Sequence, residues 1–203
     1  GLPDSIRSWK SRIEETDPDK TFSVGLIYGP SGCGKSSLVK AGLLPRLCDD
    51  VLPIYVEAAA SNTELRILKQ LGQHFSRLNA GNDSLPEVLA GLRLTGAGRD
   101  RKVLLVLDQF EQWLHAHGGE VSSQLIDALR QCDGRRVQCI VMVRDDFWMA
   151  ATRFMRELEV RLIEGVNSGS VDLFDQDHAR RVLAAFGRAY GRLSEELTAD
   201  QET

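Results

Sequence analysis

The residues best suited to chemistry form one continuous run, Gly29-Pro30-Ser31-Gly32-Cys33-Gly34-Lys35-Ser36, which matches the phosphate-binding pattern G-x-x-x-x-G-K-[ST]. Glycines allow a tight turn that brings backbone N–H groups against phosphate oxygens, and the start of a following helix favours negative charge. Lys35 can reach the β- and γ-phosphates of a nucleotide, and the Ser36 hydroxyl can bind Mg²⁺. The predicted nucleotide-binding residues are Gly29, Pro30, Ser31, Gly32, Cys33, Gly34, Lys35, Ser36 and Ser37.

The alternative for this run is a glycine-rich turn that only caps a helix. Its surroundings favour the phosphate loop, because the apolar run Phe22–Tyr28 precedes it and a helical pattern over Lys35–Leu44 follows it.

A second candidate group, Asp108-Gln109-Phe110-Glu111, directly follows the apolar run Val103–Leu107. Mg²⁺ keeps several waters and takes one or two carboxylates as protein ligands, so Asp108 is predicted to hold the metal together with Ser36. Glu111 lies one turn further on and could orient or deprotonate an attacking water. The alternatives are a helix N-cap for Asp108 and a solvated first-turn acid for Glu111.

A third candidate, Arg144, ends the apolar run Val137–Val143 and precedes Asp145-Asp146. Residues that leave the carboxyl ends of parallel strands face the ligand crevice of an α/β sheet. Arg144 could therefore contact the γ-phosphate and report its presence. The alternative is a surface ion pair with Asp145 or Asp146, which contributes little to stability.

These candidates need a sheet to position them, and the apolar runs supply its strands. Five strands are predicted over Phe22–Tyr28, Val51–Glu57, Val103–Leu107, Val137–Val143 and the Val171/Leu173 pair, with Gly165–Gly169 as a loop. Pro53 favours a strand start or a sheet edge. Helices are predicted over Leu2–Ile13, Lys35–Leu44, Thr63–Leu78, Leu85–Leu92, Ser122–Gln131, the stretch from Arg144 to Leu162, and Asp175–Leu193.

The alternation of strands and helices predicts a three-layer α/β domain with a mostly parallel five-stranded sheet. Short right-handed connections place the carboxyl end of every strand on one edge. The phosphate loop, Asp108 and Arg144 are therefore expected to meet there.

The composition bounds the class of protein. The chain has 203 residues, of which 42% are hydrophobic and 27% charged, with a net charge of −4. The apolar content disfavours disorder, and the acidic balance disfavours nucleic acid as the main partner. No apolar stretch approaches the roughly 20 residues that span a bilayer. The four cysteines form no C-x-x-C pair and are interpreted as reduced thiols of a cytoplasmic protein.

Three blocks together resemble the STAND class of P-loop NTPases, the signal-transduction ATPases with numerous domains, and above all its bacterial branch called novel STAND type 1. The blocks are Gly29–Leu47, Val103–Gln112 and Val141–Trp148. The resemblance implies an AAA+-like fold in which the Arg144 strand lies between the phosphate-loop strand and the Asp108 strand. It also implies an NTPase core over 21–174 and the start of a truncated helical lid over 175–203, whereas the segment 1–20 is predicted as a helix and linker from its own pattern.

The resemblance further implies a molecular switch that binds ATP or ADP with Mg²⁺ and hydrolyses ATP slowly. Members of the class couple ATP binding to homo-oligomerisation and to effector activation, through effector and sensor-repeat domains on the same chain. Bacterial signalling, cell death and defence against phage are typical roles.

Residue by residue, Lys35 and Ser36 match the class's Walker A pair, Asp108 its Mg²⁺ carboxylate and Arg144 its first sensor position. Glu111 matches the first glutamate of the class's Asp-Gln-Phe-Glu-Glu block. The last acid of that block is replaced by Gln112, which leaves Glu111 as the only nearby glutamate.

Two other classes of ATP-binding protein also fit parts of the sequence. The phosphate loop resembles that of ABC cassettes, but Leu94–Gly98 matches their L-S-G-G-Q signature only weakly. Those proteins also need a helix between the signature and the acidic strand, and Val103 follows too soon to leave room for one. A small-molecule kinase would require an acceptor site and an arginine-rich lid.

Overall fold

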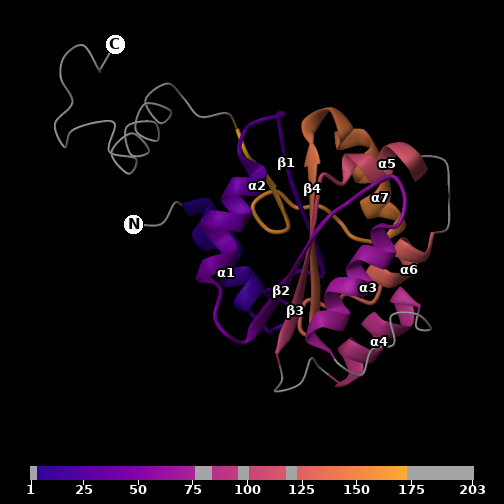
Figure 1. Cartoon of the computed structure of the whole chain (residues 1–203). Coiled ribbons are helices and arrows are strands. Elements are labelled where there is room, and N and C mark those ends of the chain that lie inside the picture. Colours follow the sequence, from indigo (N-terminus) through magenta and orange to yellow (C-terminus); the bar gives the residue numbers. More distant parts are fainter. Residues whose placement is uncertain (1–3, 76–83, 96–100, 118–122, 173–203) are drawn as a thin grey trace, which may run out of the picture. The chain divides into compact units, whose positions relative to one another are not determined.

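A computed structural model describes residues 4–75, 84–95, 101–117 and 123–172 (Figure 1). Apart from Asp172, these residues belong to one compact unit, residues 1–171. Its core is a five-stranded sheet in the order β2-β3-β4-β1-β5, in which neighbouring strands are parallel. The strands are β1 (Val24–Gly29), β2 (Val51–Glu57), β3 (Lys102–Asp108), β4 (Val137–Arg144) and β5 (Ser168–Ser170).

The strand order confirms the predicted fold class. Strand β4, which ends in Arg144, lies between the phosphate-loop strand β1 and the Asp108 strand β3. Strand β2 forms one edge of the sheet, as Pro53 indicated, because proline cannot donate a ladder hydrogen bond.

Helices connect the strands and cover both faces of the sheet. They are α1 (Asp4–Glu14), α2 (Lys35–Ser37), α3 (Thr63–His74), α4 (Leu85–Thr95), α5 (Glu111–His117), α6 (Gln124–Leu129) and α7 (Trp148–Glu157). The short helix α2 continues without a break into a π-helical turn, Leu38–Leu43, and a 3-10 turn, Leu44–Arg46. The predicted helix over Lys35–Leu44 is thus present, with a local widening that often accompanies functional sites.

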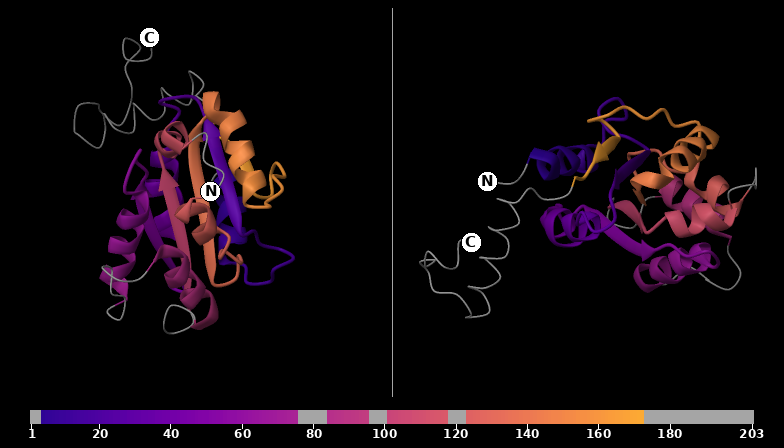
Figure 2. Two further views of the ribbon diagram at one scale, coloured as in Figure 1. Left: turned by 90° about the vertical axis from the view of Figure 1, so that its right-hand side faces the viewer. Right: turned by 90° about the horizontal axis from the view of Figure 1, so that it is seen from above.

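Two hydrophobic clusters show that the sheet is buried on both faces. Leu105 and Val141 belong to a cluster that includes side chains from α3 to α7, whereas Val106 and Ile140 belong to a cluster with α1 and the phosphate-loop helix. The strands therefore have continuous apolar runs, not the alternating pattern of a half-exposed sheet. Helices α1 and α2 lie on one side of the sheet in Figure 1, and the left panel of Figure 2 looks onto the layer of α3 to α7.

Helix α1 packs on the same face as the phosphate-loop helix. Its buried residues Ile6, Trp9 and Ile13 have the predicted helical spacing, and the Trp9 ring meets that of Phe22 edge-on at 5.4 Å. The end of α1 is also tied to β3, because the Lys102 ammonium donates to the carbonyl of Ile13 at 2.6 Å and to that of Glu15 at 2.7 Å.

The position of the last strand was predicted wrongly. Strand β5 occupies Ser168–Ser170, inside the segment expected to be a loop, and not the Val171/Leu173 pair. The Ser-Gly-Ser sequence carries no apolar signal, because this short edge strand contributes backbone pairing more than side-chain burial.

Two further expectations concern the second half of the chain. The helix predicted to run on to Leu162 ends as α7 at Glu157, shortly before Glu159, whose φ of 60° is incompatible with a continuing helix. The predicted lid over residues 175–203 lies outside the described residues.

Candidate nucleotide-binding site

The candidate site lies at the carboxyl edge of the sheet, where the predicted residues leave neighbouring strands. In the parallel register, Gly29 at the end of β1 lies beside Arg144 at the end of β4. Asp108 at the end of β3 lies beside Glu57 at the end of β2. The sheet therefore brings the phosphate loop and both predicted polar strand ends to one edge, as the sequence predicted.

The phosphate loop has the backbone that its glycines were expected to provide. Gly32 and Gly34 adopt φ values of 77° and 89°, a left-handed conformation that other residues rarely adopt. The Lys35 ammonium folds back over the loop and donates to the carbonyl oxygens of Gly29 at 2.8 Å and Pro30 at 2.9 Å. Phosphate oxygens form stronger, charge-assisted hydrogen bonds with an ammonium group than neutral carbonyls do. A phosphate in the loop would therefore compete with these two carbonyls for the Lys35 ammonium.

The other predicted loop residues surround this lysine. Cys33 is buried, with its sulfur 3.6 Å from the Lys35 nitrogen, which agrees with its interpretation as a small filler. Ser31 and Ser37 have exposed side chains.

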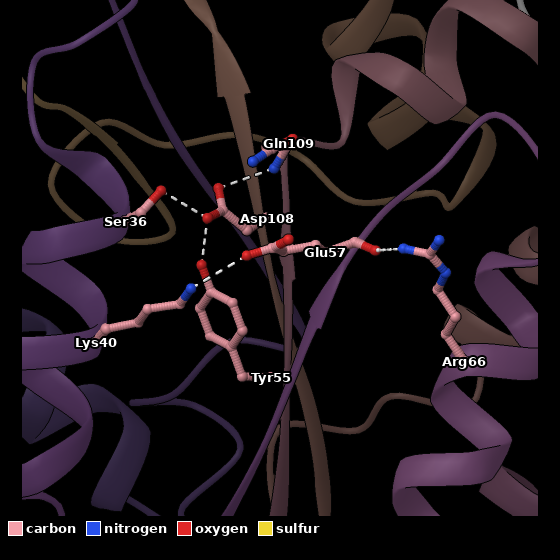
Figure 3. Close-up of polar contacts among 7 residues, drawn as sticks. All are labelled: Ser36, Lys40, Tyr55, Glu57, Arg66, Asp108 and Gln109. Atoms are coloured by element: carbon pink, nitrogen blue, oxygen red, sulfur yellow. Dashed lines mark hydrogen bonds and ion pairs between the residues drawn. The ribbon is translucent and has the colours of Figure 1, made fainter.

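Asp108 is buried and lies at the centre of the partly buried polar cluster that Figure 3 shows. The Ser36 hydroxyl donates to its Oδ2 at 2.6 Å, and the backbone N–H of Gln109 donates to its Oδ1 at 2.8 Å. The Tyr55 hydroxyl also donates to Oδ2. Burial, and then the hydrogen bond to Asp108, raise the pKa of Tyr55, so this phenol stays protonated and acts as a donor.

The pair formed by Ser36 and Asp108 fits a magnesium site. A hydroxyl and a carboxylate are hard oxygen ligands, and Mg²⁺ is commonly held by one or two such groups together with phosphate oxygens and waters. Within the described ranges, no group of three or more His, Cys, Asp or Glu side chains could hold a metal by itself.

Glu111 begins α5 directly after the Asp108 turn, in which Gln109 has a φ of 53°. Its carboxylate is buried, and its Oε2 has no hydrogen-bond partner among the described residues. A buried carboxylate oxygen without a donor is uncommon, and it indicates a place for a water molecule or a ligand. Gln112, which replaces the last acid of the class's block, is exposed instead.

Arg144 lies beside the loop strand but is already paired. Its Nε donates to Asp146 Oδ1 at 3.0 Å, and its terminal nitrogen contacts the other oxygen of the same carboxylate. The pair is exposed. The ion pair that the sequence offered as the alternative is thus present, and contact with a γ-phosphate would require Arg144 to exchange partners.

The sequence did not single out Tyr55 and Lys40. The Lys40 ammonium lies 4.3 Å from the centroid of the Tyr55 ring and 3.2 Å from Glu57 Oε1. The sequence signal that could have identified Tyr55 is its position, two residues before the end of a strand whose carboxyl end lies at the same sheet edge as Asp108.

The family described as novel STAND NTPase 1 matches residues 6–198 of the chain. No curated protein matches. No helix among the described residues is long and apolar enough to span a bilayer.

Similar solved structures include the ADP form of the ORC2 protein of Aeropyrum pernix, with 18% identity and a TM-score of 0.63 over 93% of this chain and 54% of that one. A Walker-type ATPase of Pyrococcus abyssi has 17% identity and a TM-score of 0.67 over 94% of this chain and 59% of that one. Cdc6p of Pyrobaculum aerophilum has 15% identity and a TM-score of 0.59 over 96% and 52%. This chain therefore spans between half and three fifths of the length of these proteins, and the likeness shows that it shares their fold. With residues 6–198 matched, the chain belongs to the novel STAND NTPase 1 family.

Proposed function

We propose that this domain binds ATP and ADP with Mg²⁺ at the phosphate loop and acts as a slowly hydrolysing molecular switch. The observation that carries the proposal is the 2.6 Å hydrogen bond between Asp108 and Ser36, the residue that follows the loop lysine. Because the chain belongs to the novel STAND NTPase 1 family, we favour this function over the ABC-cassette and kinase alternatives.

Each residue of the site has a separate task in this proposal. Loop N–H groups and Lys35 bind the phosphates, with Lys35 leaving the carbonyls of Gly29 and Pro30 to do so. Ser36 and Asp108 hold Mg²⁺, which when bound neutralises charge on the β- and γ-phosphates. Arg144 contacts the γ-phosphate after leaving Asp146, and it thereby distinguishes ATP from ADP.

Glu111 is the proposed general base for hydrolysis. Its unpartnered Oε2 can accept a hydrogen bond from water and orient it for attack. The exposed Gln112 supplies no second carboxylate, which supports slow turnover and a long-lived bound state.

The switch acts through parts of the protein outside this domain. Family membership supports a role in signal transduction in the cytoplasm, with nucleotide state controlling homo-oligomerisation and the activity of attached effector and sensor-repeat domains. Bacterial signalling, cell death and phage defence are the proposed settings. One similar structure is of a Drosophila ORC bound to DNA, but the net charge of −4 gives no support for a nucleic-acid partner here.

Mass analysis of the nucleotide that copurifies with the 203-residue chain, together with a turnover assay, tests the proposal. Copurified ADP or ATP with turnover well below the median enzyme rate of about 10 s⁻¹ supports a switch. Turnover at or above that rate, or transfer of phosphate to a small-molecule acceptor, would contradict it.

A further inference from the structure

Tyr55, which lies outside the phosphate-loop motif, contacts Asp108, the carboxylate proposed to bind the metal. Its hydroxyl donates to Asp108 Oδ2, the same oxygen that accepts the proton of Ser36. Figure 3 shows the two hydroxyl groups converging on this oxygen from different elements, the loop helix and the edge strand β2.

We propose that Tyr55 is a positioning residue for Mg²⁺: it holds the Asp108 carboxylate in the orientation that the metal requires. This inference rests on the proposed function, because it assigns Tyr55 a role at the same Ser36–Asp108 site.

The parallel register explains how Tyr55 reaches Asp108. Tyr55 is paired with Val106, and Glu57 is paired with Asp108. Side chains two apart on a strand share a face, so Val106 and Asp108 point to the same side of the sheet. Tyr55 packs with Val106 on that side, which the phosphate-loop helix also covers. From there, the long phenol side chain extends along the strand to the carboxylate.

One contact covers the Tyr55 ring, and two contacts hold the end of its strand. Lys40, in the π-helical turn after the phosphate loop, lies over the ring and pairs with Glu57 at the end of β2. Arg66 of α3 donates to the Glu57 carbonyl at 3.0 Å. Each exposed contact is individually weak, but the Lys40 contact restricts the ring while the Glu57 contacts fix the strand end that carries it.

The count of acceptor sites shows why a second hydroxyl donor matters. An ionised carboxylate has about four lone-pair sites. On Asp108, Ser36 and Tyr55 account for two sites on Oδ2, and the Gln109 N–H accounts for one on Oδ1. The remaining site on Oδ1 is available to a metal or to its water. If Ser36 reorients when it binds metal, Tyr55 still fixes the carboxylate.

The test is the Mg²⁺ dependence of ADP binding to the full 203-residue chain, compared between the wild type and Tyr55→Phe. The phenylalanine keeps the ring and removes only the hydroxyl. Loss of a group that orients a metal ligand typically costs 10- to 100-fold in metal affinity. The Mg²⁺ concentration that gives half of the maximal strengthening of ADP binding should therefore rise about 10-fold or more. The dissociation constant of ADP in EDTA should stay unchanged.

Tyr28→Phe is the matched control, because it removes the hydroxyl of another tyrosine, one that contacts Glu164. Its Mg²⁺ dependence should equal that of the wild type. Lys40→Met offers a second route, since it removes the cation over the ring but leaves the hydroxyl in place, and it should shift the Mg²⁺ dependence less in the same direction.

The outcomes separate this inference from the proposed function. If the wild type responds to Mg²⁺ and Tyr55→Phe responds identically, Tyr55 has no positioning role while the site itself stands. Equal weakening with and without Mg²⁺ would also overturn the inference, because it would show a general structural effect. If the wild type binds no nucleotide, or binds it without any response to Mg²⁺, the proposed function fails first.

Discussion

Ser36 and Asp108 form a 2.6 Å hydrogen bond although 72 positions separate them in the chain. Ser36 comes directly after Lys35 in the phosphate loop, which follows β1. Asp108 ends the fully buried strand β3, which is separated from β1 in the sheet by β4. Their contact places the two predicted metal ligands together before any metal arrives. The site is thus built by the order of the strands and not by local sequence.

Replacement of Asp108 by asparagine tests its role as a metal ligand. The amide keeps the size of the side chain but loses the negative charge that favours Mg²⁺. The strengthening of ADP binding by Mg²⁺ should fall at least about tenfold, whereas binding in EDTA should change little. Asp127→Asn, at an exposed aspartate paired with Arg130, serves as the control and should behave as the wild type. An unchanged Mg²⁺ response in Asp108→Asn would exclude the carboxylate as a ligand.

Glu111→Gln should stop hydrolysis without preventing binding. The amide fits the same buried space but cannot accept a proton, and loss of a general base typically slows a reaction by about 10²- to 10⁴-fold. Phosphate release under single-turnover conditions measures this rate. The neighbouring exposed Gln112 gives the control, since Gln112→Ala should keep the wild-type rate. Equal rates for Glu111→Gln and the wild type would show that Glu111 is not the base.

Arg144→Ala should weaken ATP binding about tenfold and leave ADP binding within about twofold of the wild type, because a charged hydrogen bond to the γ-phosphate is lost in ATP alone. Competition titrations with the two nucleotides measure the ratio. The exposed Arg153 of α7 supplies a matched arginine-to-alanine control. A sensor role is contradicted if both nucleotides are weakened equally, in which case the pair with Asp146 is only structural.

The buried Lys102 predicts how stability depends on pH. Burial lowers its pKa from 10.5 to about 8, so between these values the unfolded chain binds more protons than the folded one. The free energy of unfolding therefore gains a contribution from Lys102 that rises with pH, by at most about 1.4 kcal/mol per pH unit. Below pH 8 the contribution is constant, because the lysine is protonated in both states.

Urea unfolding of the wild type and of Lys102→Met between pH 7 and pH 10 measures this contribution as a difference. Other groups also contribute to the pH dependence in this range, including Cys132, because burial raises the pKa of its thiol in the folded chain above that of the unfolded chain. The contributions of these other groups cancel in the difference between the unfolding free energies of the two proteins, since both proteins keep those groups. The wild type should gain stability relative to the variant as the pH rises above 8. Parallel curves across the whole range would show that Lys102 has an ordinary pKa in the folded chain.

The features predicted from the sequence are those with a strong local pattern. The buried strands that end in Gly29, Asp108 and Arg144 have continuous apolar runs, and the loop motif has fixed residue types. Their meeting at one edge followed from the general rules of parallel sheets. The place of the Arg144 strand between the other two came only from the family resemblance, since no local pattern encodes strand order.

The features that sequence reasoning missed depend on contacts between distant elements. Tyr55 looked like an ordinary strand residue, because the register that pairs it with Val106 and aims it at Asp108 is set by the whole sheet. Strand β5 was misplaced because Ser168–Ser170 pairs through its backbone, without an apolar side-chain pattern. The ion pair of Arg144 with Asp146 was one of two partners that the sequence left open, because the local pattern Arg-Asp-Asp does not decide which group the guanidinium contacts.

The most direct test of the central claim is calorimetric titration of ADP with Mg²⁺ into the wild type and into Lys35→Ala. Lys20→Ala, which removes an exposed lysine paired with Asp17, is the control. One nucleotide should bind per chain in the wild type and in Lys20→Ala. Lys35→Ala should bind at least about tenfold more weakly, because it lacks the cation that the loop holds ready for the phosphates. Equal binding by Lys35→Ala, or no binding by the wild type freed of its copurified nucleotide, would contradict the claim that this loop is a nucleotide site.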